Sequence, residues 1–262
     1  MVKKFLSRGW ARWPVEAHVA AWSAAVRPVA EARVNDPALR AAWLQCEGTW
    51  FVGVDALPNG PDGAVGGSGP LSGAAFTEAG RLYGSLPLHA AQVSVTYPGY
   101  PRPRKGEGEA AFRYRLKRDA AHVDGLLAEG KARRRMLKER HAYILGLPLT
   151  ECDPGASPLV VWEGSHLVMR AVFAKALGPH PEASWDRIDL TETYHAARRQ
   201  VFDRCPRVAV PARPGEAFLV HRLALHGVAP WAVDASAPAA GRMIAYFRPE
   251  LPPGSRAWLE LP

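Results

Sequence analysis

The sequence has few cysteines and no long apolar run, and these absences exclude several classes of protein. Its three cysteines, Cys46, Cys152 and Cys205, are far apart and form no CxxC pair, so neither a disulfide framework nor a thiolate zinc site is indicated. No stretch approaches the ~18 apolar residues of a membrane-spanning helix. The first residues, MVKKFLSRGWARW, lack the unbroken apolar segment of a secretory leader. We therefore expect a soluble cytoplasmic protein with no membrane partner.

Acidic residues are the scarcer charged class. The chain has 33 Lys and Arg against 25 Asp and Glu, which gives a net charge of +8. A basic protein favours anionic partners, either a small molecule or nucleic acid. The basic residues are scattered, however, with short clusters only at 102–105 and 131–140, so a solvated basic surface explains the charge as well.

Helical patterns dominate the first part of the chain. Apolar residues recur at helical spacing between residues 15 and 26, and Pro28 should end that helix. Asp36 followed by Pro37 is typical of the start of a second helix. The other elements expected here are a strand over 49–54, a Gly/Pro-rich loop over 57–73 and a helix over 74–84.

Short β-type runs bounded by Gly, Pro or Asp follow from residue 89 onward. Many short strands without a βαβ rhythm indicate an antiparallel barrel or jelly roll, and helical patterns at 165–177 and 191–202 interrupt it. We expect one domain, 1–262: mainly β with flanking helices, its jelly-roll core over 89–250 and its residues 1–88 mostly helical. The expected strands are AAQVSVTY (90–97), AAFRYRLKR (110–118), HAYILGLPL (141–149), PLVVW (158–162), EAFLVH (216–221) and RMIAYFR (242–248).

A histidine and an acid two residues apart are the first candidates for chemistry. In the stretch DAAHVDGLLA, His122 and Asp124 would share one face of a strand. His226, in HRLALHGVAPW, follows an apolar strand and could meet them across a closed barrel. Two imidazoles and one carboxylate form the facial triad of non-haem Fe(II) oxygenases. His221 competes for the distal role, and we prefer His226 because its neighbour Gly227 permits close approach to a metal complex.

Two arginines of the last expected strand, Arg242 and Arg248, are six residues apart and would lie on one face. A guanidinium that points into an apolar barrel needs an anionic partner. Arginine binds carboxylate as a bidentate fork, so Arg242 could orient the dicarboxylate 2-oxoglutarate. Arg248 is a second candidate to bind the co-substrate, although pairing with a protein carboxylate at the barrel rim is an equally good explanation for it.

The order of these motifs resembles the phytanoyl-CoA dioxygenase-like branch of the Fe(II)/2-oxoglutarate oxygenases over residues 109–250. The motifs are HVD, LPLTECDPGASPLVVWEGSH, HGVAPW and GRMIAYFRP. The resemblance implies a double-stranded β-helix (jelly-roll, cupin-like) core. It also implies that His122, Asp124 and His226 bind Fe(II), that Arg242 anchors 2-oxoglutarate, and that O2 is consumed with release of succinate and CO2. His141 is expected to face the same cavity.

The substrate is less well indicated. Where the family often has a small polar residue and an asparagine after the distal histidine, this chain reads VAPW (228–231), and a helical insertion lengthens the spacing to that histidine. A Pro/Gly-rich loop over 97–109 has the composition of a mobile lid. Its basic residues Arg102, Arg104 and Lys105 are candidates to contact a small, anionic organic substrate that the enzyme would hydroxylate.

Two other functions are compatible with these residues. AlkB-type nucleic-acid demethylases use a His-x-Asp, a distal histidine and two strand arginines with this spacing, and a basic chain suits them. The basic residues show no aromatic-interleaved groove, so we expect no tight nucleic-acid binding. The third hypothesis is a barrel-type binding protein without iron. The presence of His122, Asp124, His226 and Arg242 together, in this order, argues against it.

Overall fold

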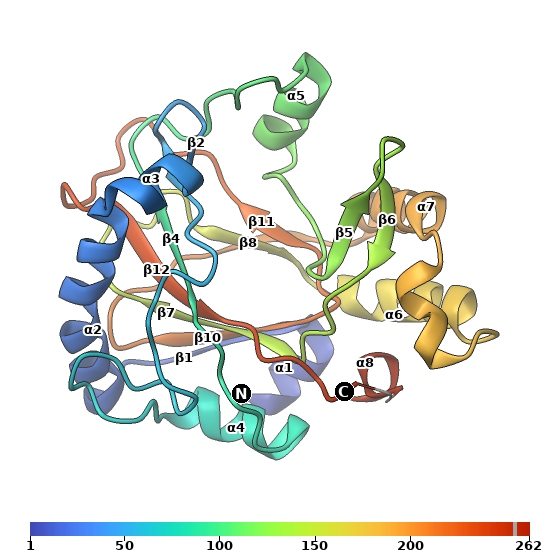
Figure 1. Ribbon diagram of the computed structural model, residues 1–262, viewed down its shortest axis with the longest axis horizontal. Helices are drawn as coiled ribbons and strands as arrows, with labels where there is room; N and C mark the ends of the chain where they lie inside the picture. The colour runs from blue at the N-terminus through green and yellow to red at the C-terminus, as the bar shows by residue number, and fades with distance from the viewer. Residues whose placement is uncertain (254–255) are drawn as a thin grey trace.

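A computed structural model describes residues 1–253 and 256–262 and shows two antiparallel sheets facing each other (Figure 1). The larger sheet has the order β1-β10-β7-β12-β4-β3-β2, the smaller one β11-β8-β9, and β5 and β6 form a separate hairpin. The strands are β1 (Trp10–Trp13), β2 (Leu44–Gln45), β3 (Trp50–Phe51), β4 (Gln92–Thr96), β5 (Leu126–Glu129), β6 (Arg134–Leu137), β7 (Tyr143–Pro148), β8 (Leu159–Trp162), β9 (Arg207–Val210), β10 (Ala217–His221), β11 (His226–Val228) and β12 (Arg242–Phe247).

An apolar cluster lies between the two sheets. Ile144 of β7 and Phe218 of β10 come from the larger sheet, while Leu159 and Val161 of β8 come from the smaller one. Alternate strand residues point to the same face, so each strand gives every second side chain to this interior. Packing in this interior requires a glycine at position 146, because a Cβ on Gly146 would lie 2.1 Å from the ring of Phe218. The jelly-roll prediction is confirmed.

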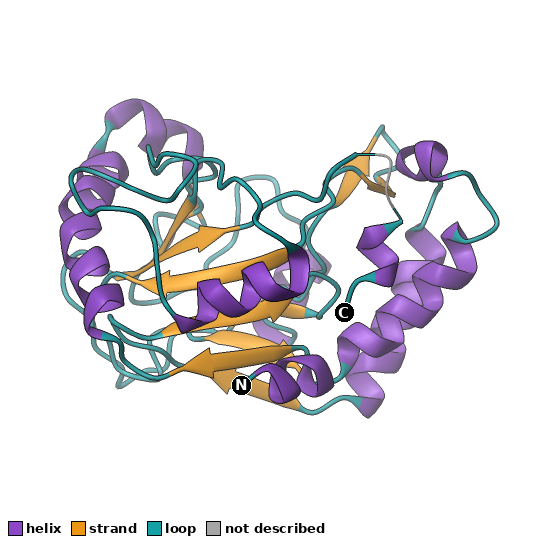
Figure 2. Cartoon of the chain, turned by 90° about the horizontal axis from the view of Figure 1, so that it is seen from below, coloured by secondary structure: helices purple, strands orange, loops and turns teal. Residues whose placement is uncertain are grey.

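Helices cover the outer face of the larger sheet (Figures 1 and 2). Val19, Trp22 and Val26 of α2 are buried in the outer core, where the ring of Trp22 lies 5.9 Å from that of Phe247 on β12. The helical elements are α1 (Val2–Arg8), α2 (Ala17–Asn35), α3 (Pro37–Trp43), α4 (Ala74–Tyr83), α5 (Glu109–Lys117), α6 (Ser165–Leu177), the 3-10 helix η1 (Glu182–Arg187), α7 (Thr191–Arg204) and α8 (Ala257–Glu260). Among the described residues, no helix has the length and apolar character needed to cross a membrane.

Several sequence expectations are confirmed at residue level. The Asp36 carboxylate accepts hydrogen bonds from the backbone N–H groups of Ala38 and Leu39, at 2.9 and 3.0 Å, and so caps α3. Helices α6 and α7 lie between β8 and β9 in the chain, as the interrupting helical patterns predicted.

Two expectations were wrong. Pro28 does not end the first helix: α2 continues to Asn35, because burial of Ala30 and Val34 outweighs the disruption that an internal proline causes. The run AAFRYRLKR is helix α5, not a strand, and its one buried residue, Arg115, forms an ion pair with Glu107. Strands β1, β2 and β3 also show that the larger sheet draws on residues before 89.

Candidate metal centre

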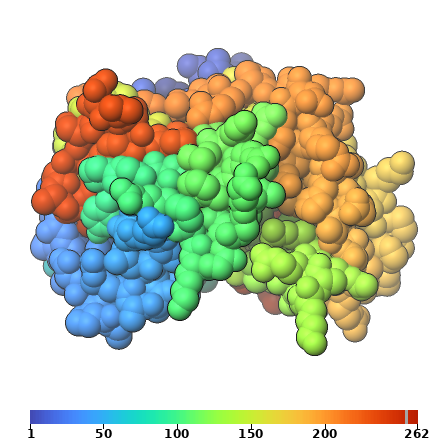
Figure 3. All heavy atoms as spheres, turned by 90° about the horizontal axis from the view of Figure 1, so that it is seen from above, coloured from blue at the N-terminus to red at the C-terminus, as the bar shows by residue number. Residues whose placement is uncertain are grey.

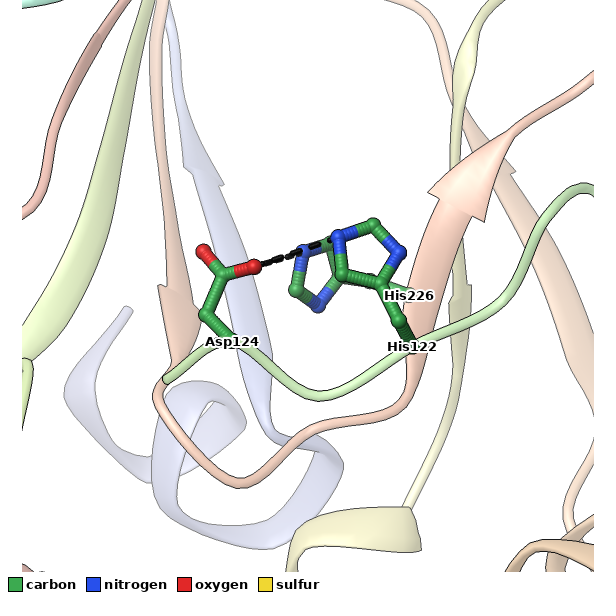
Figure 4. Close-up of side chains that lie close together, drawn as sticks. All are labelled: His122, Asp124 and His226. Carbon is green, nitrogen blue, oxygen red and sulfur yellow. Dashed lines mark ion pairs between the residues drawn. The ribbon is translucent and has the colours of Figure 1, made fainter. Parts of the chain in front are cut away.

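Two histidines more than a hundred residues apart lie directly opposite each other. His122 and His226 form an isolated antiparallel bridge, in which the His122 N–H donates to the His226 carbonyl at 2.8 Å and the His226 N–H donates back at 3.0 Å. Residues directly opposite each other in an antiparallel pair project to the same side. Their ring centroids are accordingly 4.6 Å apart (Figure 4).

Asp124 completes the cluster. Its Oδ1 lies 3.1 Å from Nε2 of His122 and 3.6 Å from Nε2 of His226. The three candidate ligand atoms all lie within 4.8 Å of one another, and no other group of this kind occurs in the part of the chain that the structure describes. The sequence predicts that His122 and Asp124 share one face of a strand. In the structure they lie instead in the irregular segment between α5 and β5.

Backbone carbonyls set the orientation of both imidazoles. Nδ1 of His122 lies 3.0 Å from the Ala120 carbonyl, and Nδ1 of His226 lies 3.0 Å from the Ala224 carbonyl. A carbonyl only accepts, so each Nδ1 carries a proton, and each Nε2 is the ring atom directed at Asp124 and at a metal bound there. This is the outer-shell arrangement that fixes the tautomer of metal-binding histidines.

The charge states also suit a cation. Burial, opposed by the carboxylate of Asp124, lowers the pKa of His226 to about 4, so its imidazole is neutral at pH 7. Burial alone would raise the pKa of Asp124, but the neighbouring His226, His122 and Arg248 hold it well below its usual range. The site therefore offers a neutral imidazole from His226 and an ionised carboxylate from Asp124, beside the imidazole of His122.

Arg248 contacts the carboxylate of Asp124 from the other side. Its Nη1 lies 3.5 Å from Asp124 Oδ2, whereas the histidines face Oδ1. This contact matches the rim pairing considered for Arg248 and leaves one carboxylate oxygen directed at the two imidazoles.

An interior cavity of about 200 Å³ opens from the cluster into the space between the sheets. Its walls come from both sheets and hold apolar side chains beside a few polar ones. The lining residues are Trp50, Val52, Val54, Gln92, Ser94, His122, Asp124, Ile144, Leu159, Val220, His226, Gly227, Val228, Tyr246 and Arg248.

Arg242 lies further along the interior face of β12, beyond the lining residues. It alternates with Ile244 and Tyr246 on that face, as predicted, and is only 7% exposed. Its Nη1 is buried without a hydrogen-bond partner, and so is Oγ1 of Thr96, which lies opposite it on β4. Buried polar atoms are almost always satisfied, so these two are suited to receive a ligand.

His141 is not part of this cluster. Nδ1 of His141 contacts the Arg248 carbonyl and Nε2 contacts Glu139, both at 3.0 Å. The side chain lines a different surface pocket, beside His89 and Glu250, so the expectation that it faces the interior cavity was wrong.

His221, the competing distal ligand, is buried elsewhere. Its Nε2 lies 2.9 Å from Nη2 of Arg170, and its Nδ1 accepts from the Leu223 N–H at 2.9 Å. The ring packs against Phe5 and His166, so it points toward α1 and α6. Both ring nitrogens are occupied, which leaves His226 as the distal histidine of the cluster.

We expect acid to destabilise the protein through His221. Burial, with the nearby Arg222, His166 and Arg170, holds the pKa of His221 well below its usual range. The unfolded chain takes up this proton near pH 6.5 and the folded chain does not, so stability should fall as pH drops below about 6.5. Thermal melts of wild type and His221→Gln at pH 7.5 and 5.5 test this.

His221→Gln should have a lower melting temperature than wild type at pH 7.5. Between pH 7.5 and 5.5, however, its melting temperature should fall by less than that of wild type. His180→Gln, a change at an exposed position, is the matched control. An acid-induced loss as large in His221→Gln as in wild type would contradict the assignment.

Gly227 allows close packing, but not against a metal. A Cβ at this position would lie 2.1 Å from the backbone oxygen of Asp119, in the segment leading to His122. The reason proposed from the sequence for preferring His226 was therefore wrong, although the residue chosen is the one in the cluster. The glycine keeps β11 close to the segment that carries His122 and Asp124.

Gly227→Ala should therefore push those two segments apart. We expect a loss of about 1–3 kcal/mol in the free energy of unfolding, with weaker metal binding. Gly80→Ala is the control: it lies inside α4 with no atom near the added Cβ, and it should stabilise by up to about 1 kcal/mol. Chemical denaturation measures both, and an unchanged unfolding free energy for Gly227→Ala would contradict the packing argument.

A second hollow, the outer cleft, adjoins the cluster on the surface and has a volume of about 510 Å³. In Figure 3 the surface is hollowed between the green segment that includes α5 and the lime segment of the β5–β6 hairpin. The outer cleft shares Trp50, His122, Asp124 and Arg248 with the interior cavity. The cluster thus lies at the boundary between the two spaces, and the His122 side chain is 52% exposed.

Only one of the three loop residues proposed to contact substrate lines the outer cleft. That residue is Arg104, whose guanidinium lies 5.0 Å from the ring centre of Trp50. Arg102 is exposed and pairs with Glu47 at 3.4 Å, and Lys105 lines a separate pocket. Sequence reasoning missed Arg135 and Arg198, which also line the outer cleft, although Arg135 belongs to the basic cluster at 131–140.

Comparison with solved structures identifies the fold. No protein-family model matches the sequence, and no curated protein matches it. The chain is similar to SnoK, a non-haem alpha-ketoglutarate-dependent carbocyclase from nogalamycin biosynthesis, with a TM-score of 0.53, 19% identity, and coverage of 98% of this chain and 87% of that one. It is also similar to AviO1 from Streptomyces viridochromogenes Tue57, with a TM-score of 0.50, 19% identity, and coverage of 97% and 96%. The chain therefore has the double-stranded β-helix fold seen in the non-haem, 2-oxoglutarate-dependent oxygenases.

Proposed function

We propose that this protein is an Fe(II)- and 2-oxoglutarate-dependent oxygenase that hydroxylates a small organic anion and releases succinate and CO2. The observation that carries the proposal is the cluster of His122, Asp124 and His226. Two imidazoles and one carboxylate on one side of an ion are the donor set of non-haem Fe(II) oxygenases, and they leave positions free for other ligands. Thiolates, which would favour zinc or iron–sulfur clusters, are absent from this group.

The interior face of the larger sheet offers groups suited to the co-substrate. 2-Oxoglutarate is a dicarboxylate, and Arg242 offers a buried guanidinium nitrogen with no partner in the part of the chain described. Arg242 would hold the distal carboxylate as a charged fork, assisted by the hydroxyl of Thr96 opposite it. Ile144, Leu159 and Val220 line the cavity beside the cluster and would exclude water.

Bound iron would supply the oxidising chemistry with O2 and 2-oxoglutarate, and the protein would position and shield the reactants. The carbonyls of Ala120 and Ala224 hold the two Nε2 lone pairs in place. Arg248 holds the second oxygen of Asp124. The exposed side of His122 faces the outer cleft, from which a substrate would approach.

Turnover without a known substrate provides the direct test. Purified protein is incubated with Fe(II), 2-oxoglutarate and O2, and succinate is measured. We expect slow succinate release that requires Fe(II). A protein that binds Fe(II) and 2-oxoglutarate yet forms no succinate, with or without a panel of candidate substrates, would contradict an oxygenase and favour the binding-protein reading.

Nucleic acid is the main alternative substrate, and salt dependence distinguishes it. A protein that neutralises many phosphates loses affinity steeply as salt rises, because condensed counterions are released. We expect no tight binding of methylated or unmethylated oligonucleotides at physiological salt. Sub-micromolar affinity with a steep salt slope, coupled to demethylation, would overturn the small-molecule proposal.

A further inference from the structure

The outer cleft is unusually rich in arginine. Six guanidinium groups line it against three carboxylates, together with the aromatic rings of Trp50, Tyr114 and Tyr194 and apolar side chains such as Leu126. The arginines are Arg104, Arg115, Arg133, Arg135, Arg198 and Arg248, and the carboxylates belong to Glu107, Asp124 and Glu139.

All three carboxylates already have partners. Glu107 pairs with Arg115, Asp124 Oδ2 lies 3.5 Å from Arg248, and Glu139 lies 3.0 Å from His141. Within residues 1–253 and 256–262, no carboxylate lies at ion-pair distance from the guanidinium groups of the cleft arginines Arg104, Arg135 and Arg198. Half-buried charges without counter-charges are unfavourable unless an anion joins them.

Neighbouring groups hold these three arginines in place. The guanidinium of Arg198 lies 4.6 Å from the ring centre of Tyr114 and 5.3 Å from that of Tyr194. Arg135 Nη1 donates to the Leu126 carbonyl at 3.3 Å. Arg104 lies over Trp50, and its Nε is buried without a partner. Stacking uses the faces of Arg104 and Arg198. Arg198 also hydrogen-bonds the hydroxyl groups of Tyr114 and Tyr194, so an anion would meet its remaining N–H groups and the unpartnered Nε of Arg104.

Arg135 and Arg198 act on the same part of the cleft. Burial raises the pKa of Tyr194, and the positive charges of both arginines oppose this increase. Arg135 is also joined to α7 through its backbone N–H, which donates to Thr191 Oγ1 at 2.8 Å. Arg135 from β6 and Arg198 from α7 thus line the same cleft as Tyr194.

We propose that the outer cleft binds an organic phosphate substrate, with its phosphate on Arg135 and Arg198 and a further contact from Arg104. The apolar part of the substrate would lie against Leu126 and Val123, close to His122. A phosphate monoester carries about −1.5 to −2 charges at pH 7 and three acceptor oxygens, so it satisfies more than one guanidinium, whereas one carboxylate carries a single charge. This inference names the substrate class of the oxygenase proposed above and rests on that proposal.

The shape of the outer cleft favours a small molecule over a polymer. Its volume of about 510 Å³ lies within the usual range of small-molecule sites, roughly 300–1,000 Å³. The arginines line a recess next to the cluster, whereas nucleic-acid binding would need basic side chains spread along an open surface.

Binding of phenyl phosphate, measured by calorimetry on the full chain without turnover, tests the proposal. The wild-type protein should bind phenyl phosphate and should bind phenol much more weakly, because phenol lacks the charge. Arg198→Gln and Arg135→Gln should each raise the dissociation constant by about tenfold or more. Arg199→Gln and Arg102→Gln are matched controls, since these exposed residues do not line the outer cleft, and they should leave the affinity within about twofold of wild type.

Each other outcome has a defined meaning. Wild type that binds Mn(II) and 2-oxoglutarate but not phenyl phosphate would overturn this inference and leave the proposed oxygenase intact. Binding that is lost in Arg242→Ala but kept in the Arg135 and Arg198 variants would also overturn it, because the probe would then occupy the site proposed for 2-oxoglutarate. If benzoate binds more tightly than phenyl phosphate, the cleft recognises a carboxylate and the phosphate proposal is wrong. If oligonucleotides bind tightly and this binding depends on Arg135 and Arg198, the ligand of the cleft is nucleic acid and the small-molecule proposal is wrong. Failure of the proposed function itself would appear separately, as wild type that binds no metal.

Discussion

Asp124→Ala and His226→Ala should each abolish stoichiometric metal binding, which we expect at about one Fe(II) per chain. Removing either leaves two of three protein ligands, and removing Asp124 also removes the only negative charge of the cluster. Anaerobic Fe(II) titration by calorimetry, or Mn(II) binding followed by electron paramagnetic resonance, measures the loss. Succinate release should disappear with the metal.

His221→Gln is the control for that experiment. His221 has a similar degree of burial to His226 but lies outside the cluster, with both ring nitrogens occupied by Arg170 and Leu223. The variant should bind metal as wild type does at pH 7.5, provided that its circular dichroism shows a folded protein. Full iron content in His226→Ala, with loss in His221→Gln, would show that the distal ligand is assigned to the wrong histidine.

Arg242→Ala should weaken 2-oxoglutarate far more than it weakens metal. The substitution removes the buried fork proposed for the distal carboxylate and leaves the three metal ligands unchanged. Loss of one partner of a buried charge pair costs about 2–5 kcal/mol, which is about 30-fold to several thousand-fold in affinity. Titration of 2-oxoglutarate into the metal-loaded protein measures the change.

Two comparisons make the result specific. Arg248→Ala should affect 2-oxoglutarate less, because Arg248 pairs with Asp124 and also lines the outer cleft. Arg242→Lys keeps the charge but not the bidentate geometry, so it should recover only part of the affinity. An unchanged 2-oxoglutarate affinity in Arg242→Ala would remove Arg242 from the co-substrate site.

Local signals in the chain were sufficient for much of the fold. Strands β4, β7, β8, β10 and β12 were visible as short apolar runs between breakers, and α3, α4, α6 and α7 as helical periodicity with recognisable ends. These signals are local because propensity, capping and apolar spacing act over a few residues. Prediction from local sequence failed where charge or tertiary burial determined the secondary structure. The examples are α5, which was predicted as a strand, and α2, which continues past Pro28.

The sequence by itself determined which residue types could form the metal cluster and in what order they occur. It favoured His226 over His221 only through the family resemblance and an argument about Gly227 that was wrong, because the two histidines lie only five residues apart at the end of the same apolar run. The tertiary structure decided that choice through the reciprocal backbone bridge between His122 and His226, a contact across more than a hundred residues. It likewise placed His141 in another pocket and brought Arg104, Arg135 and Arg198, from three separate segments, into one cleft. Contacts between residues so far apart in the sequence depend on how sheets and helices pack, and no local pattern encodes them.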